Sequence, residues 1–172
     1  NSRTLVRNVD VRWEVDIRPA YYQVLKGDTL TDIQGSFHVT DKDSVIPWGV
    51  WMNGPAVGGW SNPGATDWDF GLMNNLDKKL YDDGTHGDVA AGDSIFTRTL
   101  TFSADSLGIG SKGQIGQVFK YGVKGGDNEG GKGGYGNNHA ENIDDATSSF
   151  VLRTQFGSIN PKFYDAWDYN CE

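Results

Sequence analysis

Two aromatic residues stand alone among glycines, prolines and amides, where little apolar cover is available for their rings. Trp60 lies in a Gly- and Pro-rich run, and Tyr135 stands among glycines with amides and an imidazole after it. An exposed aromatic face packs on the C–H face of a pyranose, while amide side chains bond its hydroxyls. The sequence alone leaves open that Trp60 folds back over the core and that the second run is a solvated surface loop. The predicted carbohydrate-binding residues are Trp60, Tyr135, Asn137, Asn138, His139 and Asn142.

Acidic residues gather in two loops, and carboxylate oxygens are the ligands that Ca²⁺ prefers. The candidate ligands are Asp82, Asp83, Asp88 and Asp93 in the first loop, and Asp127, Glu129, Asp144 and Asp145 in the second. The first loop does not follow the EF-hand spacing, and Asp and Gly also form tight turns without any ion. We therefore expect Ca²⁺ as a possible cofactor, with plain turns as the alternative. Zinc is not expected, because His38, His86, His139 and Cys171 show no ligand spacing.

No pattern in the chain indicates catalysis. Carboxylates are plentiful, but nothing sets one pair apart for glycoside hydrolysis. The sequence contains no nucleophile elbow, no phosphate-binding loop and no Cys–His pair. We therefore expect that the protein is not an enzyme.

The segments that must position these loops have the alternating pattern of β-strands. Residues 9–17 alternate apolar and charged side chains without a break, and no segment carries a helical stripe over three turns. Two stretches, 54–77 and 124–146, are too long for plain connections, and long loops on a β scaffold often bind ligands. The predicted fold is all-β, an immunoglobulin-like antiparallel β-sandwich of about seven strands with two long loops. Further strands are expected at 31–39, 45–53, 78–81, 95–102, 115–123 and 149–156.

Composition and charge exclude several classes of partner. The chain has 172 residues, enough for one domain over 1–172, and a formal net charge of -8. That charge disfavours nucleic acid and anionic membranes, and no apolar run is long enough for membrane insertion. The single cysteine, Cys171, permits no intramolecular disulfide. Because the chain begins with Asn1 rather than Met, we expect a processed segment of a longer protein.

Three short segments together resemble the starch- and glycogen-binding type of carbohydrate-binding module. They are the strand 11–17, the run 50–54 leading to Trp60, and Val118-Phe119-Lys120-Tyr121. The resemblance implies an immunoglobulin-like sandwich in which Trp60 is the first stacking aromatic. Tyr135 stands where the family normally has a second Trp, and the stretch 137–139 occupies the adjacent polar position. The stretch 124–146 is longer than the family's usual loop.

The acidic loop 82–93 is similar to loops of secreted proteins from Bacteroidota-like bacteria. This similarity implies an extracellular or cell-surface protein, with other domains of a larger secreted protein as partners. The first functional hypothesis is non-catalytic binding of an α-glucan or related polysaccharide. The alternative is a structural subunit of an extracellular filament or surface layer, which assembles with copies of itself through an N-terminal arm (1–8) and an aromatic C-terminal tail (160–172).

Overall fold

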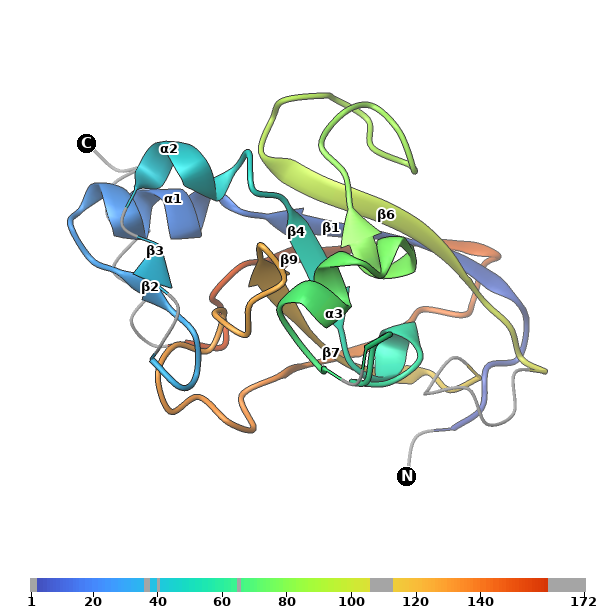
Figure 1. The fold of residues 1–172 in the computed structure, drawn as a ribbon. Helices are drawn as coiled ribbons and strands as arrows, with labels where there is room; N and C mark the ends of the chain where they lie inside the picture. The colour runs from blue at the N-terminus through green and yellow to red at the C-terminus, as the bar shows by residue number, and fades with distance from the viewer. Residues whose placement is uncertain (1–2, 36–37, 40, 65, 106–112, 161–172) are drawn as a thin grey trace.

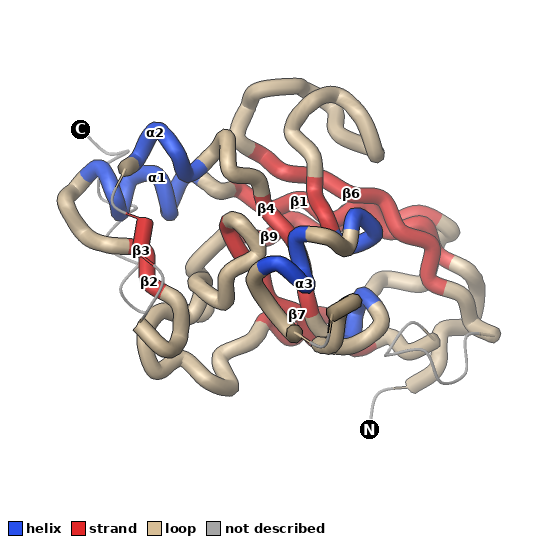
Figure 2. The backbone as a smooth tube through the Cα atoms, in the orientation of Figure 1, coloured by secondary structure: helices blue, strands red, loops and turns tan. Residues whose placement is uncertain are grey.

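The computed structural model describes residues 3–35, 38–39, 41–64, 66–105 and 113–160, and strands dominate it (Figures 1 and 2). The strands are β1 (Val9–Asp16), β2 (Leu30–Thr31), β3 (His38–Val39), β4 (Val50–Asn53), β5 (Lys79–Leu80), β6 (Ile95–Phe102), β7 (Gly116–Val123), β8 (His139–Asn142) and β9 (Ser149–Gln155). The helices are α1 (Arg18–Leu25), α2 (Lys42–Val45) and α3 (Phe70–Met73), with 3₁₀ turns η1 (Pro55–Val57) and η2 (Leu76–Lys78).

The strands form two main sheets, one of three strands in the order β6-β1-β9 and one of four in the order β5-β4-β7-β8. The short pair β2–β3 lies with α1 and α2 at one end of these sheets (Figure 1). A backbone bridge between Tyr81 and Thr97 joins the two main sheets at one corner. The all-β expectation is confirmed at this level.

One expected feature of the sheets is wrong, because the strands are not antiparallel throughout. β1 pairs antiparallel with β6 but parallel with β9, in a register that places Asp10 opposite Ser149. A parallel pair needs a long crossover connection. The chain between β1 and β9 supplies this connection, because it contains all four strands of the other sheet.

The two sheets contact each other through aromatic side chains. Trp13 of β1 is fully buried and packs edge-on against Phe119 of β7, with ring centroids 4.5 Å apart. It also contacts Phe102 of β6 at 5.9 Å. Alternate residues of β1 share this buried face, because successive side chains of a strand point to opposite sides. The core therefore lies between the sheets, as the alternation over 9–17 predicted.

Several expected boundaries differ from the structure for local reasons. Pro19 ends the first strand as expected, but it also lies in the first turn of α1, where a missing N–H costs nothing. The expected strand 45–53 is shorter, because Gly49 at φ 80° separates α2 from β4. The expected strand 31–39 is two short strands around a turn. β8 lies inside the stretch 124–146, which was expected to be a loop.

The described part of the N-terminal arm packs on its own domain. Arg3 forms a two-pronged ion pair with Asp145, with both N–O distances 2.6 Å, and holds the pKa of that carboxyl well below its usual range. Thr4 bridges to Gln114, and Leu5 is buried. The expected C-terminal tail lies outside the described residues from 161 onward, as does Cys171. Within the described residues, no helix has the length and apolar character needed to cross a bilayer.

Candidate functional site

A groove lies where the two long stretches of chain approach each other on the outer side of the four-stranded sheet. One half, about 280 Å³, is lined by Trp60, Trp68, Lys120, Tyr135 and Asn138 among others. The adjoining half, about 470 Å³, is lined by residues that include Asp32, Gln34, Thr66 and Asp69. Three residues, Asp67, Trp68 and Asp127, line both halves. We call the two halves together the aromatic–acidic groove.

Two glycines let the indole rings lie directly on the sheet. A Cβ at Gly54 would lie 3.2 Å from Cη2 of Trp60, and a Cβ at Gly122 would lie 3.1 Å from Cζ3 of Trp68. A Cβ at either position would force the indole to shift by a few tenths of an ångström. At Gly122 the Cβ would also lie 2.2 Å from the Gly126 carbonyl oxygen, so glycine is required there. The two indole centroids are 6.1 Å apart and the ring planes are inclined at 40°. The rings therefore form a shallow, angled platform, and both are half-buried.

A cluster of buried polar side chains, Asn53, Asn62 and Lys78, holds the loop that carries both rings. The amide nitrogens of Asn53 and Asn62 each donate to the carbonyl oxygens of Trp60 and Asp67, at 2.6–3.1 Å. The Lys78 ammonium donates to Asn53 Oδ1 at 2.8 Å. Burial of Lys78 removes water from its ammonium and lowers its pKa. We call these three residues the polar cluster; it satisfies loop carbonyls that would otherwise be buried without partners.

The second long stretch, 124–146, is anchored by side chains that hydrogen-bond the backbone of β7 where a neighbouring strand would otherwise do so. Asn128 donates to the Val123 carbonyl oxygen and accepts from the Val123 N–H, at 2.9 and 3.0 Å. The fully buried Glu129 carboxylate accepts from Tyr121 N at 2.7 Å and is 2.5 Å from His139 Nε2. Residues 125–130 are therefore buried, whereas residues 132–133 and 135–137 of the same stretch are exposed, as expected of a surface loop.

Lys120 and Asp127 form a buried ion pair at the base of the groove. Their N–O distance is 2.8 Å, and Lys120 is 2 % exposed. Burial raises the pKa of Asp127, and the neighbouring ammonium partly offsets that effect. The Asp127 carbonyl oxygen also accepts from Ile33 N at 2.9 Å. This pair therefore joins the floor of the groove to the segment that follows β2.

Three of the six predicted sugar-binding residues line the groove. Trp60, Tyr135 and Asn138 line the aromatic half, and the Tyr135 ring is 65 % exposed. His139 is instead buried, stacked on Phe119 with ring centroids 4.9 Å apart. Asn137 and Asn142 are exposed but do not line the groove, and Asn142 ends β8 opposite Gly116.

The sequence analysis did not predict Trp68 as a binding residue, although its sequence surroundings resemble those of Trp60. It lies between Asp67 and Asp69, in a run as poor in apolar neighbours as the one around Trp60. Lys120 and Asp67 were also missed, and Asp127 was considered only as a metal ligand.

The first acidic loop brings three of its four predicted ligands together. Oxygen atoms of Asp82, Asp88 and Asp93 lie within 4.8 Å of one another. Asp83 instead accepts from the Thr85 hydroxyl, which lowers its pKa. The Asp82 carboxylate accepts from three backbone N–H groups, while burial raises its pKa. These three carboxylates would supply part of the six to eight oxygen ligands that Ca²⁺ takes.

The structure does not gather the second set of predicted metal ligands. Asp127 pairs with Lys120, Glu129 with His139, and Asp145 with Arg3. Asp144 accepts from Ala146 N at 2.9 Å. Each carboxylate is thus engaged at a different place, and these four residues form no common oxygen cluster.

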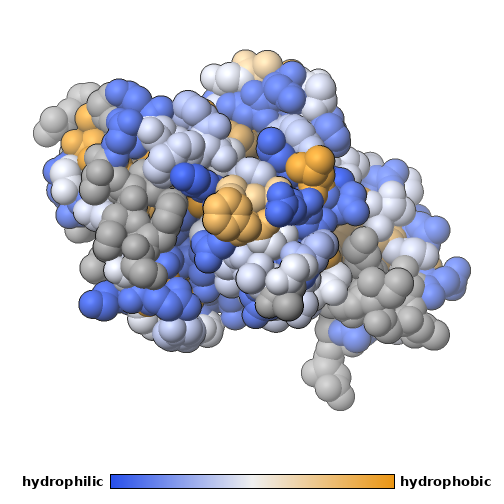
Figure 3. All heavy atoms as spheres, viewed as in Figure 1, coloured by the Kyte–Doolittle hydropathy of each residue, from blue (hydrophilic) through white to orange (hydrophobic). Residues whose placement is uncertain are grey.

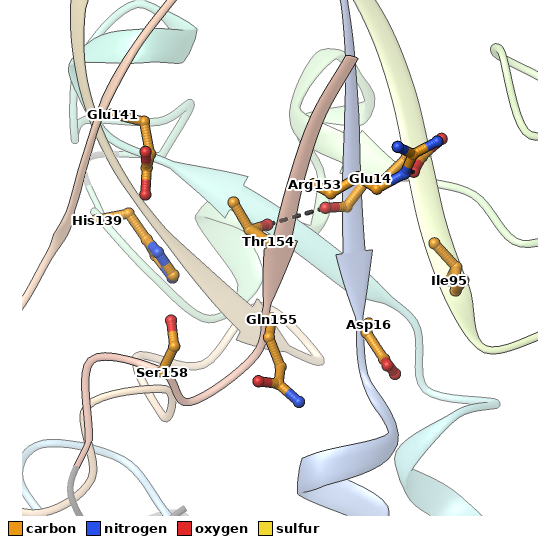
Figure 4. A pocket seen from close by; sticks show the side chains of 9 residues that line it. All are labelled: Glu14, Asp16, Ile95, His139, Glu141, Arg153, Thr154, Gln155 and Ser158. Atoms are coloured by element: carbon orange, nitrogen blue, oxygen red, sulfur yellow. Dashed lines mark hydrogen bonds and ion pairs between the residues drawn. The ribbon is translucent and has the colours of Figure 1, made fainter. Parts of the chain in front are cut away.

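A second pocket of about 470 Å³ opens between β1, β8 and β9 (Figure 4). Glu14 lies in it and is held by Arg12 at 2.8 Å and Arg153 at 2.9 Å, while its carbonyl oxygen accepts from the Thr154 hydroxyl. Among the described residues that line this pocket there is no Phe, Tyr or Trp. The aromatic–acidic groove is therefore the better candidate for binding sugar rings.

No family model, curated protein or solved structure matches this chain.

We predict that Lys78→Met loosens the groove. The variant leaves the Asn53 oxygen and loop carbonyls without their donor, so the free energy of unfolding falls by about 1–3 kcal/mol. Chemical denaturation measures this change, and Lys132→Met, at an exposed lysine, is the control with a change within about 0.5 kcal/mol. Equal changes in the two variants would contradict the role of the polar cluster.

We also predict that Ca²⁺ binds at Asp82, Asp88 and Asp93. An ion that binds the folded state alone stabilises it, by about 2.7 kcal/mol at a hundred times its Kd. Thermal unfolding with Ca²⁺ and with a chelator measures the effect. Asp88→Asn should abolish the difference, whereas Asp144→Asn should retain it. The same melting temperature with and without Ca²⁺ in the parent chain would exclude the site.

Proposed function

We propose that this protein is a non-catalytic, extracellular carbohydrate-binding domain that holds a polysaccharide in the aromatic–acidic groove. The observation that carries the proposal is the meeting of Trp60, Trp68 and Tyr135, from two separate loops, in one groove. Aromatic faces with polar groups beside them are the usual composition of a small-ligand site. For a sugar, the faces contact C–H groups and the polar groups bond hydroxyls.

The arrangement of the rings supports a curved polymer. The two indole planes are inclined at 40°, so sugar units stacked on them would also be inclined to each other. An α-glucan turns in this way along its chain, which agrees with the family that the sequence resembles. Beside the rings, the Asp67 side chain is exposed, and Asn138 offers both a donor and an acceptor.

The rest of the fold is consistent with a binding domain of this kind. Two sheets that pack through Trp13 and Phe119 support the immunoglobulin-like sandwich implied by the resemblance. The acidic composition fits a neutral polymer or other protein domains as partners and disfavours nucleic acid. We further propose secretion to the cell surface, where calcium would be available to the loop 82–93.

The contacts of the N-terminal arm favour sugar binding over assembly through the termini. Residues 3–5 contact the domain itself, through the Arg3–Asp145 ion pair and the burial of Leu5. The tail that would supply the other contact lies outside the described residues.

We predict that Trp60→Ala and Trp68→Ala each weaken polysaccharide binding by about tenfold or more, since a buried aromatic contact contributes at least about 1.4–2 kcal/mol. Retention on insoluble α- and β-glucans measures this, with chemical denaturation to verify the fold. Tyr135→Ala should have a smaller effect, because its ring is the most exposed of the three.

The control is Phe70→Ala. Phe70 is an aromatic residue that is 76 % exposed, beside Asp69 but outside the groove lining. Apolar atoms are exposed over α3 in the middle of the face drawn in Figure 3. Phe70→Ala should retain binding. Loss of binding in this variant but not in the tryptophan variants, or no retention on any glucan, would contradict the proposal.

A further inference from the structure

The floor of the groove holds an amine and a carboxyl group against each other, largely shielded from water. Lys120 is 2 % exposed and Asp127 is 9 % exposed, and Lys120 Nζ lies 2.8 Å from Asp127 Oδ1. Two glycines cover the amine. Nζ is 3.4 Å from the Gly134 carbonyl oxygen, and a Cβ at Gly130 would lie 3.4 Å from Nζ. Side chains held this closely react far faster than the same groups free in solution.

The contact between these two groups is not that of an ordinary hydrogen-bonded ion pair. Asp127 Oδ1 is buried and has no hydrogen-bond partner among the described residues, although the Lys120 nitrogen is 2.8 Å away. That distance is short enough for a hydrogen bond, so the direction of approach is what prevents one. The short contact is therefore not explained by a hydrogen bond to Oδ1, and it brings Nζ close to the carboxyl carbon.

The surroundings of this pair favour the uncharged form of the carboxyl group. Burial raises the pKa of Asp127, and the negative charges of Glu129 and Asp32 act in the same direction, whereas Lys120 partly opposes them. Transfer of one proton from Nζ to the carboxylate gives a neutral amine beside a neutral carboxylic acid. Burial penalises that neutral pair less than the two charges. These are the two forms that react to give an amide.

The other ion pairs within the described residues do not offer this chemistry, because their carboxylates face arginine guanidinium groups or the His139 imidazole. A guanidinium does not lose its proton in proteins, and an imidazole forms no lasting amide. The buried Lys78 amine contacts the side-chain oxygen of Asn53 and the carbonyl oxygen of Gly59, and amide carbons react slowly with amines. Lys120 is therefore the amine that the described part of the chain places against a carboxyl group.

We propose that Lys120 and Asp127 become joined by an amide bond between Nζ and Cγ, which makes the floor of the groove covalent. The Lys120 ammonium first gives one proton to the Asp127 carboxylate. The free amine then attacks Cγ, so that the N–C bond forms and the bond from Cγ to the hydroxyl oxygen breaks. The hydroxyl group takes a second proton from the nitrogen and leaves as water. One neutral amide and one water molecule thus replace the ammonium and the carboxylate, with no change of oxidation state.

The bond changes what holds the second long stretch, 124–146, on the sheet. Lys120 belongs to β7 and Asp127 to this stretch, so the amide closes a small ring that persists when the surrounding hydrogen bonds break. Its N–H keeps the Gly134 carbonyl oxygen as an acceptor. The water leaves into the aromatic half of the groove, which Lys120 and Asp127 both line. This inference does not depend on sugar binding, because it concerns the chain alone.

The first measurement is the intact mass of the purified, fully unfolded chain after incubation of the folded protein at neutral pH. We expect a mass lower by one water molecule than the mass calculated from the sequence. Lys120→Met and Asp127→Ala should each have the full mass calculated for their sequences. Lys132→Met is the matched control and should keep the deficit, because Lys132 is an exposed lysine of the same stretch.

Peptide mapping of the parent chain locates the bond and does not require any variant to fold. Trypsin cuts after a lysine, but not after one whose amine is part of an amide. Cleavage at Lys112, Lys124 and Lys132 should therefore release peptides 113–124 and 125–132 as one joined species that is uncut at Lys120.

Two results would overturn the inference. The full calculated mass in the parent chain, with peptides 113–120 and 125–132 recovered separately, would show that the pair remains ionic. A water deficit that persists in Lys120→Met would come from cyclisation of an aspartate onto its own backbone rather than from this bond. Neither result bears on sugar binding, so the proposed function is decided by its own experiments.

Discussion

The structure depends on one constraint, that two loops which cover a sheet must have their buried backbone groups hydrogen-bonded. A loop that lies on a sheet has no neighbouring strand to hydrogen-bond its backbone. Each buried carbonyl or N–H that is left unpaired costs about 1–3 kcal/mol of stability. Here side chains supply the missing partners. Asn53 and Asn62 donate to the loop carbonyls of Trp60 and Asp67. Asn128 and Glu129 do the same for the β7 backbone at Tyr121 and Val123, beyond its pairing with β8.

The shape of the groove follows from these side-chain hydrogen bonds to the loops. Because the loops are held down on the sheet, the indoles of Trp60 and Trp68 lie over Gly54 and Gly122 rather than over larger residues. The rings are then fixed by backbone contacts, and their inclination is set before any ligand arrives. A preformed aromatic site loses little conformational entropy on binding. The buried Lys120–Asp127 pair gives the same floor a polar group in a fixed position.

The sequence predicts the parts that depend on local pattern. The strand 95–102 has the same bounds as β6, and the alternation over 9–17 identifies the buried face of β1. The parallel pairing of β1 with β9 is not visible in either strand alone. β8 was missed because its residues are mostly polar, and its place is decided by backbone pairing with β7. The exposure of Tyr135 was predicted because it depends on its neighbours in sequence.

Other features of the site depend on burial, which residue type does not reveal. Lys78 has the sequence appearance of a surface lysine, yet it is 4 % exposed and donates to Asn53. Glu129 was predicted as a calcium ligand because it lies in a loop with several other acidic residues. In the fold it is fully buried and bonded to His139 and the backbone. His139 was predicted to bind sugar because it follows Tyr135 in a Gly- and Asn-rich run, but it is buried against Phe119.

The most direct test of the central claim is a ¹H–¹⁵N NMR titration of the tryptophan indole N–H signals with glucose oligosaccharides. If the aromatic–acidic groove binds sugar, the signals of Trp60 and Trp68 shift progressively until they saturate. The signal of Trp13, which is fully buried between the sheets, should stay unchanged. Saturable shifts elsewhere in the protein with no change at Trp60 and Trp68 would contradict the account.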